Sequence, residues 1–216
     1  MLNPATFDVP VISTVEGASV DGVFRGDPEL DAACIAAAER LGERGPVTIS
    51  ASCGLSIRHQ AAVAASANVP VALSSLLLLP TLLRQPPPVT KIAVLVADSM
   101  CLDDDMVDVD NLEQRARLVI GGIEGERGVV VFARIQAAHP DIAAVPLECT
   151  RFPLVAPAIR RMKGSPIYDI MTLCRDGDGG RHPRGMVYLS WWPRGFRFRS
   201  SINARQNVWR GFSALA

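Results

Sequence analysis

The sequence lacks any long apolar run. A membrane-spanning helix needs roughly 20 consecutive apolar residues, and the longest run in this chain of 216 residues is the short stretch around Leu76–Leu79. The N-terminus has neither the basic segment nor the apolar segment of a secretory signal. We therefore expect a cytoplasmic protein with no membrane partner.

An excess of charge of either sign is also lacking. Lys and Arg together number 22, as do Asp and Glu, so the formal net charge is zero. Nucleic-acid-binding proteins usually carry a basic patch, so the overall balance does not favour a nucleic-acid partner. The exception is the tail 175–216, which holds eight Arg against two Asp, and all three Trp residues. Such side chains can bind single-stranded nucleic acid, but the linker-like segment 176–185 favours a poorly ordered or peripherally packed extension.

Cysteine and histidine are too few and too scattered to form a structural metal site. The five cysteines include no Cys-x-x-Cys pair, and the three histidines do not fall at zinc-ligand spacings. An odd number of cysteines in a reducing compartment also argues against a disulfide scaffold. We expect no metal, and each cysteine is then either a buried apolar side chain or a reactive thiol.

What the sequence does contain is an alternation of short strands and longer helices. The clearest strand is Lys91–Ala97, and a helix over 28–44 is predicted between an N-cap at Asp27 and a stop at Gly45. Further strands are expected at 9–15, 20–24, 47–51, 70–73, 117–120, 142–147 and 165–172, and further helices at 56–66, 75–84, 125–138 and 153–163. This order predicts an α/β fold with parallel sheets flanked by helices.

One unit of strand, cysteine, helix and proline occurs twice. Cys53 follows a predicted strand, and Pro70 opens the next strand 17 residues later. Cys149 and Pro166 repeat this arrangement with the same offset. The echo predicts two pseudo-symmetric α/β lobes. The expected domains are 1–88, 89–174 and the basic, aromatic-rich tail 175–216.

Cys53 and Cys149 are the candidate catalytic residues. Each follows a strand and precedes a helix, and ligands of parallel sheets bind beyond the carboxyl ends of the strands. The free N–H groups and the positive dipole end of a helix N-terminus stabilise a thiolate. Nearby hydroxyls and a glycine could bind an anion such as a carboxylate. The candidate substrate-binding residues are Ser52, Gly54, Ser74, Ser75 and Thr150.

Two thiols that face each other across a cleft suit the inversion of a carbon with an acidic C–H bond. One thiolate removes the proton from one face, and the other thiol delivers a proton to the opposite face. Hydroxyl and N–H groups would stabilise the enediolate-like transition state that forms beside a carboxylate. This chemistry needs no metal and no pyridoxal cofactor, and the sequence carries neither signature, so we expect no cofactor.

Four motifs resemble the aspartate/glutamate racemase superfamily. They are Thr48–Gly54, Ser74–Pro80, Leu147–Thr150 and Pro166–Ile170, and the resemblance covers Asn3–Leu173, with a shortened N-terminus and no counterpart of the tail. It implies two pseudo-symmetric lobes with the active site in the cleft between them. It also implies that Cys53 and Cys149 racemise an acidic amino acid without a cofactor, and that Gly54, Ser75 and Thr150 line the site of the substrate carboxylate.

Alternatives remain open at this point. Hydantoin racemases, maleate isomerases and malonate decarboxylases share the superfamily scaffold, and a truncated, inactive α/β binding domain is the alternative from another class. The expected partner is a small-molecule carboxylate, and a homodimer is compatible with the sequence. We interpret Cys34, Cys101 and Cys174 as structural, His59 as a weak partner for a cysteine, and Asp98 as a cleft residue or a cap. Asp169 fits a structural role at least as well as a chemical one.

Overall fold

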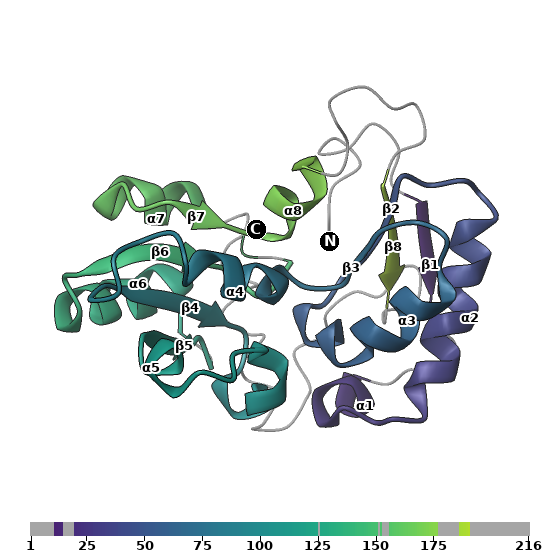
Figure 1. Cartoon of the computed structure of the whole chain (residues 1–216), viewed down its shortest axis with the longest axis horizontal. Coiled ribbons are helices and arrows are strands. Elements are labelled where there is room, and N and C mark those ends of the chain that lie inside the picture. The colour runs from purple at the N-terminus through teal and green to yellow at the C-terminus, as the bar shows by residue number, and fades with distance from the viewer. Residues whose placement is uncertain are drawn as a thin grey trace.

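Two parallel sheets form the framework of the molecule. The computed structural model describes residues 11–14, 20–124, 126–150, 152, 156–176 and 186–190. Within them, eight strands form two four-stranded sheets, and every pairing is parallel. Figure 1 shows the two sheets side by side, with helices packed around each. The predicted α/β fold class is confirmed.

The first sheet has the strand order β1-β8-β2-β3. Its strands are β1 (Val11–Thr14), β8 (Met186–Ser190), β2 (Thr48–Ala51) and β3 (Val71–Ala72). Helix α2 (Leu30–Gly42) covers this sheet and buries one stripe of small and apolar side chains, among them Cys34 and Leu41, against Ile49. Asp27 stabilises the chain just before α2, because its carboxylate accepts the N–H of Glu29 at 3.0 Å. Helix α3 (Gln60–Ser66) packs beside α2.

Strand β8 comes from the segment that the sequence predicts to be a tail. Its backbone lies between β1 and β2, with Val187 in register with both Val11 and Ile49. These five residues are therefore neither unordered nor peripheral, in contrast to the expectation for 175–216. The β-forming residues Val187 and Tyr188 are the local signal for this strand. The rest of the segment beyond Asp176 lies outside the described residues.

The second sheet has the strand order β5-β4-β6-β7. Its strands are β5 (Leu118–Gly122), β4 (Lys91–Val96), β6 (Ile142–Pro146) and β7 (Ile167–Tyr168). The chain leaves β4 toward β5 on one side and returns to β6 on the other. This reversal is a topological switch point, and ligands bind beyond the carboxyl ends of strands at such points. Helices α5 (Leu112–Arg115), α6 (Gly128–Ala138) and α7 (Ala156–Lys163) belong to this half.

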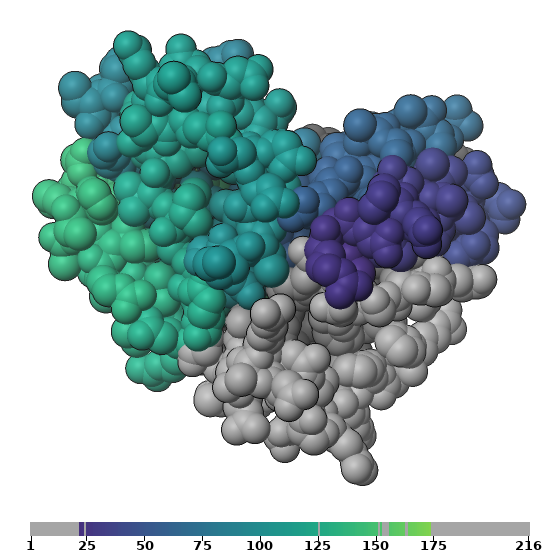
Figure 2. Space-filling view, turned by 90° about the horizontal axis from the view of Figure 1, so that it is seen from below, coloured from purple at the N-terminus to yellow at the C-terminus, as the bar shows by residue number. Residues whose placement is uncertain are grey.

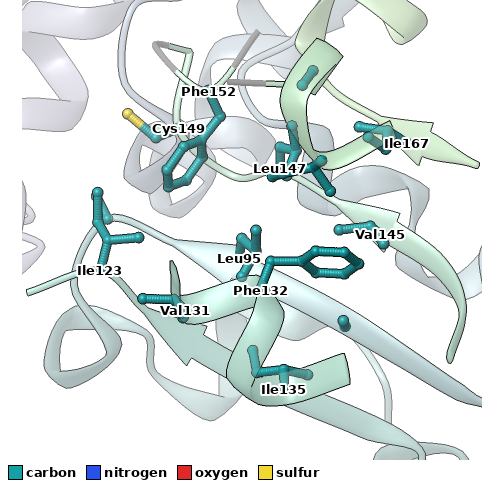
Figure 3. Packing of buried hydrophobic residues seen from close by; sticks show 14 of the residues in the cluster. Leu95, Ile123, Val131, Phe132, Ile135, Val145, Leu147, Cys149, Phe152 and Ile167 are labelled. Carbon is teal, nitrogen blue, oxygen red and sulfur yellow. The ribbon is translucent and has the colours of Figure 1, made fainter. Parts of the chain in front are cut away.

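Each face of the second sheet has its own apolar core. On one face, the fully buried rings of Phe132 and Phe152 pack around Leu95 and Val145 (Figure 3). On the other face, the 3-10 helix η3 (Ser75–Leu78) and helix α4 (Leu79–Leu82) pack against the strand β4. These two helices come from the first half of the chain, so residues before the predicted boundary at 88 help to cover the second sheet. Figure 2 shows the two halves of the chain as two bodies in contact.

A buried arginine holds the connection into the second sheet. Arg117, just before β5, is 9% exposed, and its guanidinium donates to the carbonyls of Leu83 at 2.7 Å and Thr90 at 2.9 Å. It also donates to the carbonyls of Pro86 and Pro87. Prolines have no backbone N–H, so this turn has few main-chain donors, and Arg117 supplies donors for its carbonyls, of which that of Pro87 also accepts the N–H of Thr90.

Two sequence-based element predictions are wrong. Residues 20–24, expected as a strand, form helix α1 (Val20–Arg25), which ends at Gly26 in the left-handed conformation with φ 66°. The strand expected at 165–172 stops after β7, and helix α8 (Ile170–Asp176) follows at once. Asp169 begins this helix, because its carboxylate accepts the N–H of Thr172 at 3.1 Å. None of the helices in the described residues is long and apolar enough to span a membrane.

Candidate active site

The two predicted catalytic cysteines stand at the carboxyl ends of strands in different sheets. Cys53 follows β2 and is the N-cap residue of the 3-10 helix η2 (Gly54–His59), with extended backbone angles. Cys149 follows β6, which borders the switch point of the second sheet. Cys53 is half-buried, whereas Cys149 is 4% exposed. In Figure 3, Cys149 lies at the edge of the apolar cluster, and its sulfur points away from the other labelled side chains.

Two hydroxyl groups tie these strand ends together. Thr150 Oγ1 donates to the carbonyl of Ser52 at 2.5 Å, and Ser75 Oγ donates to the carbonyl of Leu147 at 2.6 Å. Both bonds join segments from different halves of the chain. They bring the loop that carries Cys53 beside the loop that carries Cys149.

The predicted substrate-binding hydroxyls therefore have structural partners. The O–H groups of Thr150 and Ser75 are donated to main-chain carbonyls, and Ser74 Oγ accepts the N–H of Leu76 at 3.2 Å to cap η3. Ser52 differs, because its Oγ atom is buried and has no hydrogen-bond partner among the described residues. A role of these residues in substrate binding stays a prediction.

Gly54 lies directly against Glu148. A Cβ atom at Gly54 would overlap the backbone carbonyl oxygen of Glu148 and its side-chain Oε1. The glycine is therefore needed for close approach of the two segments. The carboxyl group of Glu148 thus contacts Gly54, the residue next to Cys53.

Glu148 is a buried carboxyl group that sequence reasoning missed. It is 1% exposed, its Oε2 accepts the N–H of Ala97 at 3.1 Å, and its Oε1 has no hydrogen bond within the described residues. Burial raises the pKa of Glu148 to about 7, although the N–H groups of Ala97 and Leu55 oppose that shift. A charged residue at the end of the apolar run 142–147 is the signal that could have identified it.

The electrostatics of Cys53 differ from the expectation of a stabilised thiolate. Burial raises the pKa of Cys53 well above its usual value, and the charges of Glu148 and Cys149 raise it further. The N–H groups of Leu55 and Ser56 at the start of η2 lower this pKa, as predicted, but they do not outweigh the burial. Cys53, Glu148 and Cys149 thus form one electrostatically coupled group, and Cys53 on its own is a thiol at neutral pH.

The other candidates have structural partners. His59 is buried and pairs through Nδ1 with Asp31 of α2 at 2.5 Å, so this ring nitrogen is not available to Cys53. Asp98 accepts the N–H of Met100 at 2.9 Å and caps the 3-10 helix η4 (Ser99–Cys101). Cys34 is fully buried under α2, as expected. The side chain of Cys174 lies outside the described residues. In the described part of the chain, no three His, Cys, Asp or Glu side chains are grouped to hold a metal ion.

Comparison with known proteins gives two relatives with the same activity in their names. The chain is 27% identical over 171 residues to dimethylsulfoniopropionate lyase 5 of Emiliania huxleyi, a match that covers 63% of this chain and 34% of that protein. It is 29% identical over 194 residues to a dimethylsulfoniopropionate lyase of Durusdinium sp. clade D, covering 77% of this chain and 64% of that protein. The chain thus spans less than two thirds of the length of each relative. No family model matches it.

These relatives correct the reaction predicted from the sequence. The prediction of the aspartate/glutamate racemase superfamily, of an isomerase and of racemase activity is wrong, because both relatives are named as lyases for a sulfonium compound. The alternatives do not match either: neither relative is named as a hydantoin racemase, a maleate isomerase or a malonate decarboxylase. Neither relative supports an inactive binding domain.

Proposed function

We propose that this chain is a lyase that cleaves dimethylsulfoniopropionate. The support is the coincidence of two lines of observation. Both relatives carry this activity in their names, and two cysteines with a buried carboxyl group lie together at the carboxyl ends of β2 and β6. The coupled group of Cys53, Glu148 and Cys149 is the observation that carries the proposal.

The reaction follows from the structure of the substrate. Dimethylsulfoniopropionate carries a carboxylate at one end and a positively charged sulfonium at the other. A base removes a proton from the carbon beside the carboxylate, and the electron pair forms a carbon–carbon double bond. The bond from the neighbouring carbon to sulfur then breaks, and its electrons leave with neutral dimethyl sulfide. The products are dimethyl sulfide, acrylate and the proton held by the base.

A thiolate of Cys53 or Cys149 is the proposed base. Elimination requires a single proton acceptor, in contrast to inversion at carbon, which requires two groups on opposite faces. The sulfonium cation of the bound substrate favours the ionised form of a nearby thiol, because an opposite charge lowers its pKa. Substrate binding would in this way counteract the burial that holds the proton on Cys53 in the free protein.

The test is the release of dimethyl sulfide by the purified full-length chain. Headspace gas chromatography should detect dimethyl sulfide and liquid chromatography should detect an equal amount of acrylate. Replacing the base with alanine, as Cys53→Ala or Cys149→Ala, should lower kcat roughly 100-fold or more, and replacing the other cysteine should lower it less. Cys34→Ala is the matched control, because Cys34 is a fully buried cysteine of α2 that does not belong to the coupled group of Cys53, Glu148 and Cys149.

Two outcomes contradict the proposal. A folded wild-type chain that releases no dimethyl sulfide is not this lyase, and full activity in both cysteine variants removes the thiols from the mechanism. A small carboxylate substrate, a cytoplasmic location and a homodimer stay predictions from the sequence, and the first of these agrees with the carboxylate of the proposed substrate.

A further inference from the structure

Glu148 has surroundings that stability alone does not explain. The side chain is 1% exposed, its Oε2 accepts the N–H of Ala97, and its Oε1 has no hydrogen bond within the described residues, although the N–H of Leu55 also acts to lower the pKa of this carboxyl group. A buried carboxyl group with an unsatisfied oxygen costs folding free energy. Such a costly arrangement is typical of functional sites.

Glu148 adjoins the segments of both cysteines. Glu148 precedes Cys149 in the chain, and its N–H donates to the carbonyl of Leu95 at 2.9 Å, which fixes this segment to β4. Its Oε1 atom lies against Gly54, the neighbour of Cys53. The unsatisfied oxygen is therefore the one that faces the loop of Cys53.

We propose that Glu148 is a positioning residue that biases the protonation of Cys53: an ionised Glu148 makes the Cys53 thiolate harder to form, and a neutral Glu148 makes it easier to form. Two negative charges at close range in a buried site cannot both form at low cost. The role of this control in catalysis rests on the proposed lyase function. The control itself is a property of the free protein and can be measured without substrate.

Other charged groups around this site are engaged elsewhere. Glu148 and Cys149 are the titratable groups whose charges raise the pKa of Cys53. On η2 itself, Arg58 pairs with Asp103 at 2.7 Å, and His59 pairs with Asp31 of α2. Asp104 of the 3-10 helix η5 (Asp104–Val107), which packs against η2, pairs with Arg115. The elements packed against η2 also carry the exposed residues Arg25 of α1, Glu39 and Arg40 of α2, and Asp105 of η5.

The pH dependence follows from the two groups together. Glu148, with a pKa raised to about 7, loses its proton before Cys53 does. Its new charge then opposes thiolate formation, so the thiolate fraction of Cys53 should rise less steeply with pH above about 7 than that of an isolated thiol. Cys101 provides an internal comparison, because its pKa is raised by burial and by Asp98 rather than by Glu148.

Alkylation of Cys53 tests this inference. Full-length wild type and Glu148→Gln are treated with iodoacetamide at a series of pH values, and peptide mass spectrometry gives a rate for each cysteine. Glutamine keeps an acceptor for Ala97 N–H but carries no charge, so Cys53 should react roughly three- to tenfold faster near neutral pH. Its pH midpoint should fall. The rate of Cys101 should not change.

Asp98→Asn is the matched control. Asp98 raises the pKa of Cys101, so this variant should speed alkylation of Cys101 and leave that of Cys53 unchanged. An unchanged or higher pH midpoint of Cys53 in a folded Glu148→Gln protein overturns the inference. If that variant does not fold, the pH dependence of the Cys53 and Cys101 alkylation rates in the wild-type protein tests the inference instead. A Cys53 rate that rises as steeply as the Cys101 rate through neutral pH overturns the inference as well. Neither measurement uses dimethylsulfoniopropionate, so the inference can fail while the lyase proposal stands, and the reverse.

Discussion

At the scale of single residues, the close fit of Gly54 against Glu148 decides the geometry of the site. We predict that Gly54→Ala lowers the free energy of unfolding by about 2 kcal/mol, because the added Cβ would overlap a backbone carbonyl oxygen that cannot move freely. Chemical denaturation measures the change. Gly42→Ala at the end of α2 is the control, since no atom lies within 4 Å of its Cβ position. That variant should be neutral or slightly more stable, and an equal loss in both variants would contradict the prediction.

The buried carboxyl group of Glu148 should also make the free energy of unfolding depend on pH. Its pKa is about 7 in the folded chain against an ordinary value of 4.5. As pH rises between these values, the unfolded chain gives up this proton while the folded chain keeps it, so the folded state loses stability. The loss should reach about 3 kcal/mol once Glu148 is ionised.

Glu148→Gln removes this titration. The variant should therefore gain stability relative to wild type from about pH 5 to about pH 8, and denaturation at each pH measures the difference. Cys53, whose pKa lies well above its usual value, keeps its proton across this range, so the difference isolates Glu148. A constant difference across this range would show that the carboxyl group has an ordinary pKa in the folded chain.

Sequence reasoning predicted that Cys53 and Cys149 follow strands, as they do, and it missed Glu148. The strand-end positions follow from local pattern alone, whereas the close contact of Gly54 with Glu148 does not. The burial of Glu148 depends on contact with a segment from the other half of the chain. Such contacts leave no local periodicity, and for the same reason the hydroxyls of Ser75 and Thr150 could not be assigned to main-chain partners in advance.

At the scale of elements, Arg117 provides a further prediction on stability. Arg117→Met should lower the free energy of unfolding by about 2–3 kcal/mol, because the carbonyls of Leu83 and Thr90 before β4 lose the guanidinium donor. Thermal unfolding followed by circular dichroism measures the effect. Arg134→Met is the matched control, since Arg134 is 63% exposed and its pair with Glu126 should contribute less than about 1 kcal/mol. Similar melting temperatures for the two variants would show that Arg117 does not hold this turn.

The elements predicted best are those with the strongest patterns. The apolar run of β4 and the capped, alanine-rich α2 lie within about two residues of their predicted bounds, which is the usual uncertainty of such bounds. Residues 20–24 contain valines but form α1, because packing of Val23 into the first core outweighs the strand preference of that residue type. In 165–172, the spacing of Asp169 and Thr172 is a helix-start signal that the strand assignment overlooked.

At the scale of the whole molecule, β8 holds the first sheet together, because it lies between β1 and β2. A chain that stops after Asp176 should lose hydrogen-exchange protection in β2 and α2 and keep it in β4 and β6. Mass spectrometry of deuterium uptake measures this difference. A chain that stops after Ser190 keeps β8 and is the control. Equal protection of β2 in both truncated chains would contradict the prediction.

At this scale it is also clear why the sequence motifs led to the wrong reaction, racemisation. A thiol pair at the ends of two parallel sheets can remove a proton beside a carboxylate. The arrangement of Cys53 and Cys149 predicts this step but not the step that follows it. Whether the carbanion is then reprotonated or expels a neighbouring group depends on what the substrate carries. Local motifs do not specify this, and the names of the relatives correct it.

The position of β8 also affects how the protein is made. Strands β1 and β2 emerge from the ribosome early, yet their shared neighbour is translated only at residues 186–190. The second sheet, whose strands all lie within 91–168, is complete before then and can form first. During most of translation β1 and β2 therefore present unpaired edges that are prone to aggregation, and this stage is when a chaperone would be of most use to the nascent chain.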